Sequence, residues 1–362
     1  MARLSDFRSA AALLLRAPFD HEQWLPALSA TAGATGSASA ALMGVLSSGE
    51  MQFALSPMRS QSAVRDVLCD WMRHGGNDPK RNPLTARALS APLLQEFSDA
   101  DVISQDERAR HPLWNEFYNR HGLPHYGVCS IWRSADSQIV LTLSRTESQG
   151  AIPESERSTF RRLAKRWHDA ATFLRAIKTD GTRLLAGSLE GLSIAALVLD
   201  GFGRVVAMTE AVQTIVRGGK YLRLKNGRIE AVRPDEEGPL ACAAQRCVGS
   251  VREKGRMATL RLQGSRGSAI TVRAWPLPRQ NDLAFGAAAL LILEPDGSPG
   301  LLDLGLTAAE IEVAGAVMAG EPVRDIAENR NATYETVRSQ IKSIYSKAGV
   351  RSRAEFTARC RA

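Results

Sequence analysis

The feature that most constrains the fold of this chain is a series of helix start and stop signals between residues 306 and 356. Thr307 and Glu310 form a capping box, in which each side chain bonds the backbone N–H of the other residue, so a helix is expected to begin there. Gly320 supplies the stop signal of that helix, and Pro322 suits the first position of a second one. The stretch Asn329-Arg330-Asn331 then predicts a tight turn, because Asn tolerates the left-handed conformation that such turns often need.

Two further helices are predicted after this turn. Thr333 is a suitable N-cap for the third helix, and Gly349 ends it. Ser352 and Glu355 form a second capping box, which opens a fourth helix over Ser352–Cys360. Apolar residues recur at helical spacing, as expected for short helices around one small core. These core positions are Ile311, Ala314, Val317, Met318, Val323, Ile326, Ala327, Val337, Ile341, Ile344 and Ala348.

The third helix has a basic outer face, and charge is divided unevenly along the whole segment. Positions 303–335 hold seven acidic and two basic residues, a net charge of −5, whereas positions 336–362 hold seven basic residues and one acidic residue, a net charge of +6. Two short helices joined by a tight turn, the second of them basic, are the helix-turn-helix pattern. One half of the segment can therefore face the phosphates of DNA while the other half stays away. The alternative is a solvated basic helix with no nucleic-acid role.

The segment resembles the LuxR-type (GerE-like) helix-turn-helix family over about a sixth of the chain. The resemblance runs without gaps through L-T-x-x-E-x-E-V (306–313), Gly320, I-A (326–327), T-V-R (336–338) and I-x-x-I-Y-x-K-A-G-V-x-S-R-A-E (341–355). The family usually has a small polar N-cap, a glycine and often a histidine where this chain has Pro322, Asn331 and Gln340. Pro322 and Asn331 are compatible with the same backbone.

This resemblance implies roles for individual side chains. The residues expected to face the major groove are Arg338, Ser339 and Lys342. Of these, Arg338 is the best candidate for a guanine edge, because a guanidinium bonds two acceptors at once. The residues expected to contact phosphates, which set the register on DNA, are Thr336, Gln340 and Lys347. The fourth helix, with Phe356 and Cys360, is expected to form a dimer contact, so that two half-sites about one helical turn apart are bound.

Residues 183–295 alternate strands with helices. Strands are expected at 194–199, 204–208, 222–224, 228–232, 258–262, 270–275 and 287–293, and a helix at 239–251. The Asn226-Gly227 pair is the strongest hairpin signal. Two strands, helices and then three antiparallel strands, together with L-V-L-D-G-F-G-R-V-V-A-M (197–208), are similar to a PAS-like sensor fold.

Residues 1–178 mix helices with strands. Val128–Trp132 and Ile139–Ser144 are expected to be neighbouring strands joined by a turn at Ser134–Ser137. The stretch W-N-E-F-Y-N-R-H-G-L-P-H-Y-G-V (114–128) is similar to phrases in GAF-like N-terminal domains of multidomain bacterial regulators.

A connecting helix is predicted between these two parts, with a short heptad seam. The seam consists of Phe160, Leu163, Trp167, Ala170, Leu174 and Ile177. Two interpretations are open. The helix packs on the sheet of its own domain, or it forms a dimer and carries a signal.

Composition excludes some classes of protein and leaves others open. The chain has 362 residues, enough for two or three domains. Its net charge of +8 permits nucleic acid, an anionic membrane or acidic partners. No apolar run approaches the ~18 residues of a membrane span, so no membrane association is expected. Five scattered cysteines suit a reducing cytosol.

Catalytic and metal-binding patterns are not recognisable. His111, His121 and His125 have no accompanying cluster of cysteines or carboxylates, so no metal is expected. The chain lacks G-x-S-x-G, H-E-x-x-H and Walker-type motifs, so neither an enzyme nor a cofactor is expected. An unidentified small ligand stays open. Four tryptophans are candidates for a pocket or for core positions: Trp24, Trp71, Trp114 and Trp132.

The sequence therefore predicts an α+β multidomain protein, with mixed α/β sensor-like N-terminal domains followed by an all-α four-helix LuxR-type domain. The expected boundaries are 1–178 (GAF-like, with the connecting helix), 183–295 (PAS-like) and 303–362. The expected function is that of a cytoplasmic, homodimeric transcription regulator that binds double-stranded DNA. One alternative is a small-molecule-responsive, autoinducer-like regulator. The other is a protein-interaction module with secondary DNA binding.

Overall fold

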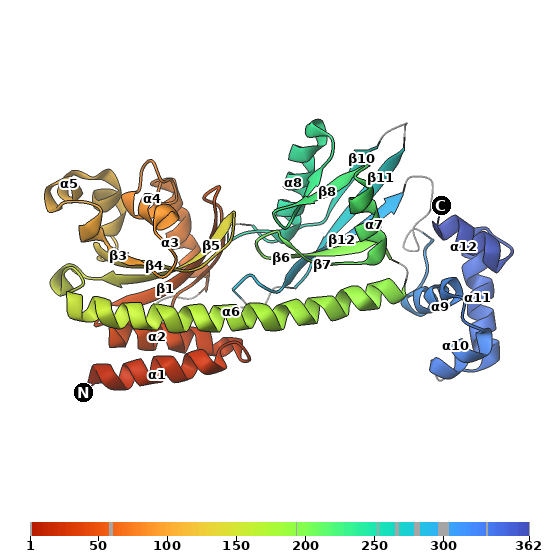
Figure 1. Ribbon diagram of the computed structural model, residues 1–362, viewed down its shortest axis with the longest axis horizontal. Coiled ribbons are helices and arrows are strands. Elements are labelled where there is room, and N and C mark those ends of the chain that lie inside the picture. The colour runs from red at the N-terminus through yellow and green to blue at the C-terminus, as the bar shows by residue number, and fades with distance from the viewer. Residues whose placement is uncertain are drawn as a thin grey trace. The chain divides into compact units, whose positions relative to one another are not determined.

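The chain forms two compact units. The computed structural model describes residues 2–57, 61–192, 194–251, 253–264, 268–278, 283–295, 304–330 and 332–361, and Figure 1 labels their elements. The first unit comprises Met1–Lys178, Gly249–Lys254 and Pro278–Gly286; the second comprises Thr179–Val248, Gly255–Leu277 and Ala287–Ala362. Most of the linker predicted at 294–300 lies outside the described residues, and the predicted domain boundaries stay predictions.

An antiparallel sheet of five strands forms the centre of the first unit. The strands are β1 (Ser39–Leu46), β2 (Met51–Leu55), β3 (Glu96–Ser98), β4 (His125–Arg133) and β5 (Ser137–Arg145), in the order β2-β1-β5-β4-β3. The neighbouring strands predicted at 128–132 and 139–144 are confirmed as β4 and β5. Both are longer than predicted, because their ladder continues to the pair formed by His125 and Arg145.

Helices cover one face of this sheet (Figure 1). They are α2 (Trp24–Ala34) and the first part of α6 (Glu154–Gly191), and α1 (Ala2–Arg16) packs against α2. The Trp167 indole Nε1 donates to Thr31 Oγ1 at 3.0 Å. The predicted seam residues Phe160, Leu163 and Trp167 are at most 1% exposed. This part of the connecting helix therefore packs within its own unit, as the first interpretation expects.

The opposite face of the sheet is covered by α3 (Gln61–Arg73), α4 (Pro83–Ser90) and η3 (Trp114–Tyr118), a turn of π-helix. The stretch singled out at 114–128 thus contains η3 and the start of β4. A short helix, α5 (Gln105–Arg110), contacts η3. Three 3₁₀ turns complete the unit: η1 (His21–Gln23), η2 (Asp99–Asp101) and η4 (Glu147–Gln149). The result is a three-layer arrangement of helices, sheet and helices.

A second antiparallel sheet lies in the second unit. Its strands are β6 (Ala196–Asp200), β7 (Val205–Met208), β10 (Ala258–Gln263), β11 (Ala269–Pro276) and β12 (Ala287–Pro295), in the order β10-β11-β12-β6-β7. Between β7 and β10 the chain forms α7 (Glu210–Gly218), the hairpin β8 (Leu222–Lys225) and β9 (Arg228–Ala231), and α8 (Pro234–Val248). All seven predicted strands are confirmed, and each end lies within two residues of its predicted position.

Two local features of this unit show how the sequence sets the backbone. Asn226 and Gly227 have φ angles of 51° and 78°, the two positive values that a tight hairpin turn of this kind requires. The helix predicted to begin at Pro239 begins instead at Pro234. Asp235, Glu236 and Glu237 occupy its first turn, where negative charge is favourable near exposed N–H groups.

Four short helices end the chain: α9 (Ala308–Ala319), α10 (Val323–Asn329), α11 (Tyr334–Ala348) and α12 (Arg353–Arg361). The first capping box is confirmed, with Thr307 N donating to Glu310 Oε2 at 2.7 Å and Glu310 N donating to Thr307 Oγ1 at 3.3 Å. Gly320 ends α9 with a φ of 96°. The predicted apolar stripes meet in one core around Val317, Ile326 and Val337, all at most 3% exposed. Ile311 is the exception: it is only partly buried and is not part of this core, and Val313, which was not predicted, lies in the core.

Two details of this bundle differ from the prediction. Pro322 is the N-cap of α10 and not its first residue, because its ψ of 144° is extended. The second capping box is incomplete. Glu355 N donates to Ser352 Oγ at 3.2 Å, but the Glu355 carboxylate accepts from Arg351 N at 2.8 Å. The turn after α10 includes Asn331, which lies outside the described residues.

Among the helices of the described residues, none combines the length and the apolar character that crossing a membrane demands.

Candidate functional site

Helix α11 has one face in the core of its bundle and one face in solvent. Its N-cap Thr333 accepts a hydrogen bond from Thr336 N at 3.2 Å, which fixes the first turn. Val337, Ile344 and Ala348 are at most 1% exposed and pack against α9 and α10. In the turn before α11, Ala332 N donates to Ala327 O at 2.9 Å. The helix is therefore held at its start and along its inner face.

The three predicted base-reading residues lie on the outer face of this helix. Arg338, Ser339 and Lys342 are all exposed. Within the part of the chain that the structure describes, no hydrogen bond or ion pair engages any of the three. Arg338 and Lys342 are four residues apart, so they lie one above the other on the helix surface. The structure brings the three together as an unengaged basic and polar surface.

The three predicted phosphate contacts are each engaged within the domain. The Thr336 hydroxyl lies 2.8 Å from Thr333 Oγ1. Gln340 Oε1 accepts from Arg330 Nη1 at 3.0 Å, and Arg330 also pairs with Glu312 at 2.9 Å. Lys347 Nζ donates to Glu310 Oε2 at 2.6 Å. Any phosphate contact by these residues would therefore extend or exchange an existing bond.

The bond from Lys347 has an electrostatic consequence. Hydrogen bonds from Lys347, the Thr307 backbone N–H and Ser343 lower the pKa of Glu310 from 4.5 to about 2. The ammonium of Lys347 also donates to Gly305 O at 3.1 Å. The capping carboxylate of α9 is thus tied to the last turn of α11. Sequence analysis missed this link, because it joins residues far apart in the chain.

The two predicted dimer residues occupy different environments. Phe356 is 0% exposed and packs in the bundle core, with its ring centroid 5.6 Å from that of Tyr345. Its side chain therefore has no surface to offer a second chain. Cys360 is only partly buried. The sequence does not indicate which face of α12 a large apolar residue in its first turn occupies; in the structure the Phe356 side chain lies in the bundle core with residues such as Val317 and Ile344.

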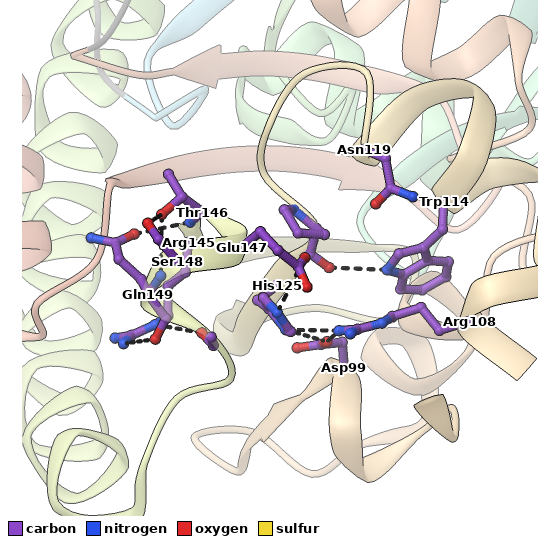
Figure 2. Close-up of polar contacts among 12 residues, drawn as sticks. Asp99, Arg108, Trp114, Asn119, His125, Arg145, Thr146, Glu147, Ser148 and Gln149 are labelled. Atoms are coloured by element: carbon purple, nitrogen blue, oxygen red, sulfur yellow. Dashed lines mark hydrogen bonds and ion pairs between the residues drawn. The ribbon is translucent and has the colours of Figure 1, made fainter. Parts of the chain in front are cut away.

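Of the three histidines singled out in the sequence, His125 takes part in a polar network, whereas His111 Nδ1 and His121 Nε2 are buried without a hydrogen-bond partner among the described residues. Figure 2 shows Asp99 between Arg108 and His125. Asp99 Oδ2 lies 2.9 Å from Arg108 Nη1 and 3.1 Å from His125 Nδ1, and Asp99 Oδ1 accepts from Tyr126 N at 3.0 Å. In the residues described, no group of three or more His, Cys, Asp or Glu side chains could hold a metal ion. The network instead ties η2 and α5 to β4.

A cavity of about 430 Å³ lies in the first unit, between the sheet and the helices α3, α4 and η3. Trp71, one of the four tryptophans considered in the sequence, lines it. Trp24 and Trp114 are core residues that are at most 1% exposed. The sequence gave no signal for this cavity, because its lining comes from separate stretches of chain between residues 38 and 146 that only the fold brings together.

Comparison with known proteins assigns the four-helix bundle. Residues 304–359 match the family model of bacterial regulatory proteins of the luxR family, called GerE. This stretch is a LuxR-type helix-turn-helix domain. The match covers the whole of α9, α10 and α11 and most of α12. No curated protein matches the chain.

Several solved structures align with the chain at low similarity. The phage VqmA–DPO complex is 13% identical, covers 51% of this chain and 88% of its own, and has a TM-score of 0.23. A VqmA–ligand–DNA complex from Vibrio cholera is 16% identical, covers 49% and 85%, and has a TM-score of 0.21. The E. coli DhaR(N)–DhaL complex is 12% identical, covers 82% and 90%, and has a TM-score of 0.25. Structural similarities with TM-scores and sequence identities this low do not support any inference about function.

Proposed function

We propose that this protein is a sequence-specific transcription regulator that reads the major groove of double-stranded DNA with α11. The proposal rests on the difference between the two faces of α11. Its inner face is fixed in the core by Val337 and Ile344, and its outer face presents side chains with no partner in the described residues. A helix that is rigidly held and unengaged on its basic side is what major-groove reading requires.

Individual roles follow from the positions on α11. Arg338 would bond a guanine edge through two N–H groups, with Ser339 and Lys342 beside it. Thr336, Gln340 and Lys347 would contact phosphates and set the register. The amide nitrogen of Gln340 has no partner among the described residues and is available to donate to a phosphate. Lys347 would exchange its bond with Glu310, or share it.

The protein would act as a cytoplasmic homodimer on two half-sites, with a dimer contact on the outer surface of α12 near Cys360. The upstream parts would control DNA binding. Support for a GAF-like part at 1–178 is the antiparallel sheet with helices on both faces. Support for a PAS-like part at 183–295 is the sheet order β10-β11-β12-β6-β7, which places the last strand beside the first. The bundle at 303–362 would then be the output domain.

A second candidate is a regulator whose DNA binding responds to a small molecule. The cavity in the first unit favours it, because its volume of about 430 Å³ lies within the ~300–1,000 Å³ range of small-molecule sites. A protein-interaction module with secondary DNA binding has no comparable observation in its favour.

The DNA-binding proposal is tested by substituting Arg338. Operator sequences are first selected from random duplexes with the full chain, and affinity is then measured by fluorescence anisotropy. Arg338→Ala is expected to weaken binding to the selected site by ~1–3 kcal/mol and to relax selection at one base pair, because a bidentate guanine contact is lost. Arg120→Ala, an exposed arginine of the first unit with the same change in charge, serves as the control. If the selected site is bound equally well by the Arg338 variant, Arg338 does not read a base.

A further inference from the structure

The cavity of the first unit has a regular floor. Met43 on β1, Val140 on β5 and Val128 on β4 lie on one face of the sheet, because alternate residues of a strand point to the same side. The roof is formed by Val67 and Trp71 of α3, Leu84 of α4 and Phe117 of η3. Protein cores normally contain few voids larger than a water molecule. This cavity, of about 430 Å³, is far above that size and partly open to solvent, so it has the dimensions of a small-molecule site rather than of a packing defect.

The lining of the cavity excludes a charged ligand. No Asp, Glu, Lys or Arg is among the described residues that surround it. A carboxylate, phosphate or ammonium group moved into such a site would lose its hydration without gaining a counter-charge, which is strongly unfavourable. His121 also lines the cavity; its Nε2 lies 3.6 Å from Asp70 Oδ2 and has no hydrogen-bond partner among the described residues. The occupant is therefore neutral and largely apolar.

Two neighbouring tyrosines with hydroxyl groups are among the residues that line the cavity. The rings of Tyr118 and Tyr126 lie with centroids 4.8 Å apart, and both residues line the cavity. The Tyr118 hydroxyl oxygen receives hydrogen bonds from Trp71 Nε1 at 3.1 Å and from Asn82 Nδ2 at 3.2 Å. Both neighbours are donors, so the hydroxyl hydrogen of Tyr118 has no acceptor among the described residues.

The orientation of Asn82 supports this assignment. Its Oδ1 accepts from Leu84 N at 3.0 Å as the N-cap of α4, which leaves Nδ2 facing Tyr118. The Tyr126 hydroxyl has no hydrogen-bond partner in the described part of the chain. Burial raises the pKa of Tyr118 to about 12 and that of Tyr126 well above 10.0, so both phenols keep their protons at neutral pH. Two neighbouring O–H groups are thus left to donate.

We propose that this cavity binds a neutral, largely apolar small molecule through a carbonyl or similar acceptor, which takes hydrogen bonds from the hydroxyls of Tyr118 and Tyr126. Buried polar groups are normally paired, and a single oxygen with two lone pairs would satisfy both donors at once. The inference rests on the proposed role of the upstream part as a sensor. It concerns binding only, so it stands or falls separately from DNA recognition.

Three matched probes test the proposal on the full chain without DNA. They share a naphthalene ring and differ in one substituent: 2-acetylnaphthalene carries a neutral ketone, 2-ethylnaphthalene has no acceptor, and 2-naphthoate is charged at pH 7.5. Equilibrium dialysis or isothermal titration calorimetry gives the affinity of each. The ketone is expected to bind roughly three- to tenfold more tightly than the ethyl compound, since one or two hydrogen bonds are gained. Naphthoate is expected to bind more weakly than either.

The variant Tyr126→Phe removes one donor and keeps the ring. It is expected to reduce ketone affinity by roughly three- to tenfold and to leave the ethyl compound unchanged. The unfolding temperature without ligand should stay the same or rise, because the lost hydroxyl had no partner. Tyr221→Phe, in the second unit, is the matched control and should change neither affinity.

Each other outcome overturns the proposal. Equal binding of the ketone and the ethyl compound would show that the site does not recognise a hydrogen-bond acceptor. A preference for the ketone that persists in Tyr126→Phe would show that the two tyrosine hydroxyls do not bind that acceptor together. Tight binding of naphthoate would contradict the neutral lining, and the absence of binding by all three probes would show that the cavity does not admit a ligand of this class. None of these results changes the expectation for DNA binding by Arg338→Ala.

Discussion

The roles of individual residues in the bundle become clear only from the side chains that they contact. Lys347 belongs to the basic half of the segment, yet its ammonium lies 2.6 Å from the carboxylate of Glu310, which is also the capping residue of α9. One carboxylate therefore serves both a helix start and a contact between helices. A residue that looks like a free phosphate contact in the sequence is partly occupied in the fold.

Glu310 should make the stability of the protein depend on pH in the acid range. Its pKa is about 2 in the folded chain and 4.5 as a free side chain. A depressed folded pKa stabilises the native state fully above the unfolded value, and this contribution is lost as pH falls through the folded value. The difference in stability between the wild type and Glu310→Gln is therefore expected to shrink between about pH 4.5 and about pH 2. Thermal melts of both full-length proteins over this range measure it, and a difference that is independent of pH would contradict the role of Glu310.

Phe356 makes a second prediction at the scale of one residue. Because its ring is 0% exposed in the bundle core, Phe356→Ala is expected to destabilise the bundle by ~3–5 kcal/mol. Hydrogen exchange by mass spectrometry, read over residues 304–361 of the full chain, reports this as lost protection. Cys360→Ala, at a partly exposed site, should have a much smaller effect. Unchanged protection together with loss of the dimer would instead assign Phe356 to a contact between chains.

At the scale of elements, short helices depend on how their ends are closed. Helices α9 and α11 both begin at a threonine, Thr307 and Thr333, whose hydroxyl accepts a backbone N–H three residues later. Gly320 ends α9 in the left-handed region, where a β-carbon is disfavoured. These closures set the length of each helix, and the length sets which side chains of α11 face outward.

Removal of one cap should therefore weaken the bundle by a predictable amount. Thr307→Ala is expected to cost about 1 kcal/mol, since the hydroxyl that accepts from Glu310 N is lost. Thr307→Ser keeps the hydroxyl and is the control. Exchange protection of α9 amides in the full chain compares the two. A Ser variant as damaged as the Ala variant would indicate that the methyl group, and not the cap, stabilises α9.

At the scale of the whole molecule, the proposed DNA binding depends on a positively charged surface of modest size. The net charge of +8 is spread over 362 residues, whereas positions 336–362 alone carry seven bases against one acid. DNA affinity of the full chain is expected to fall steeply and log-linearly with salt, because neutralised phosphates release counterions. Lys342→Ala should reduce that slope by about 1 if the lysine contacts a phosphate, and leave it unchanged if it contacts only a base. Anisotropy titrations between 50 and 300 mM salt, values typical of such work, measure the slope.

The predictability of this protein differs between its parts for physical reasons. Caps, glycine stops and periodic apolar residues act within a few positions, so the four terminal helices were predicted nearly residue by residue. The strands of the second unit, and β4 and β5 of the first sheet, were also predicted, since alternation and turn residues such as Asn226-Gly227 are local signals; β1, β2 and β3 were not. The partners of Gln340 and Lys347 were not, because Arg330 and Glu310 reach them only after the helices pack.

What the sequence determined by itself is the LuxR-type helix-turn-helix domain, with a basic helix whose outer face is Arg338, Ser339 and Lys342. These features depend on short-range hydrogen bonds and on periodicity, which a linear chain already contains. What only the tertiary structure decided is the burial of Phe356, the Glu310–Lys347 bond and the cavity with its two tyrosine hydroxyls. Those depend on which distant side chains the packed sheet and helices bring within a few ångströms of one another, and no local pattern specifies that.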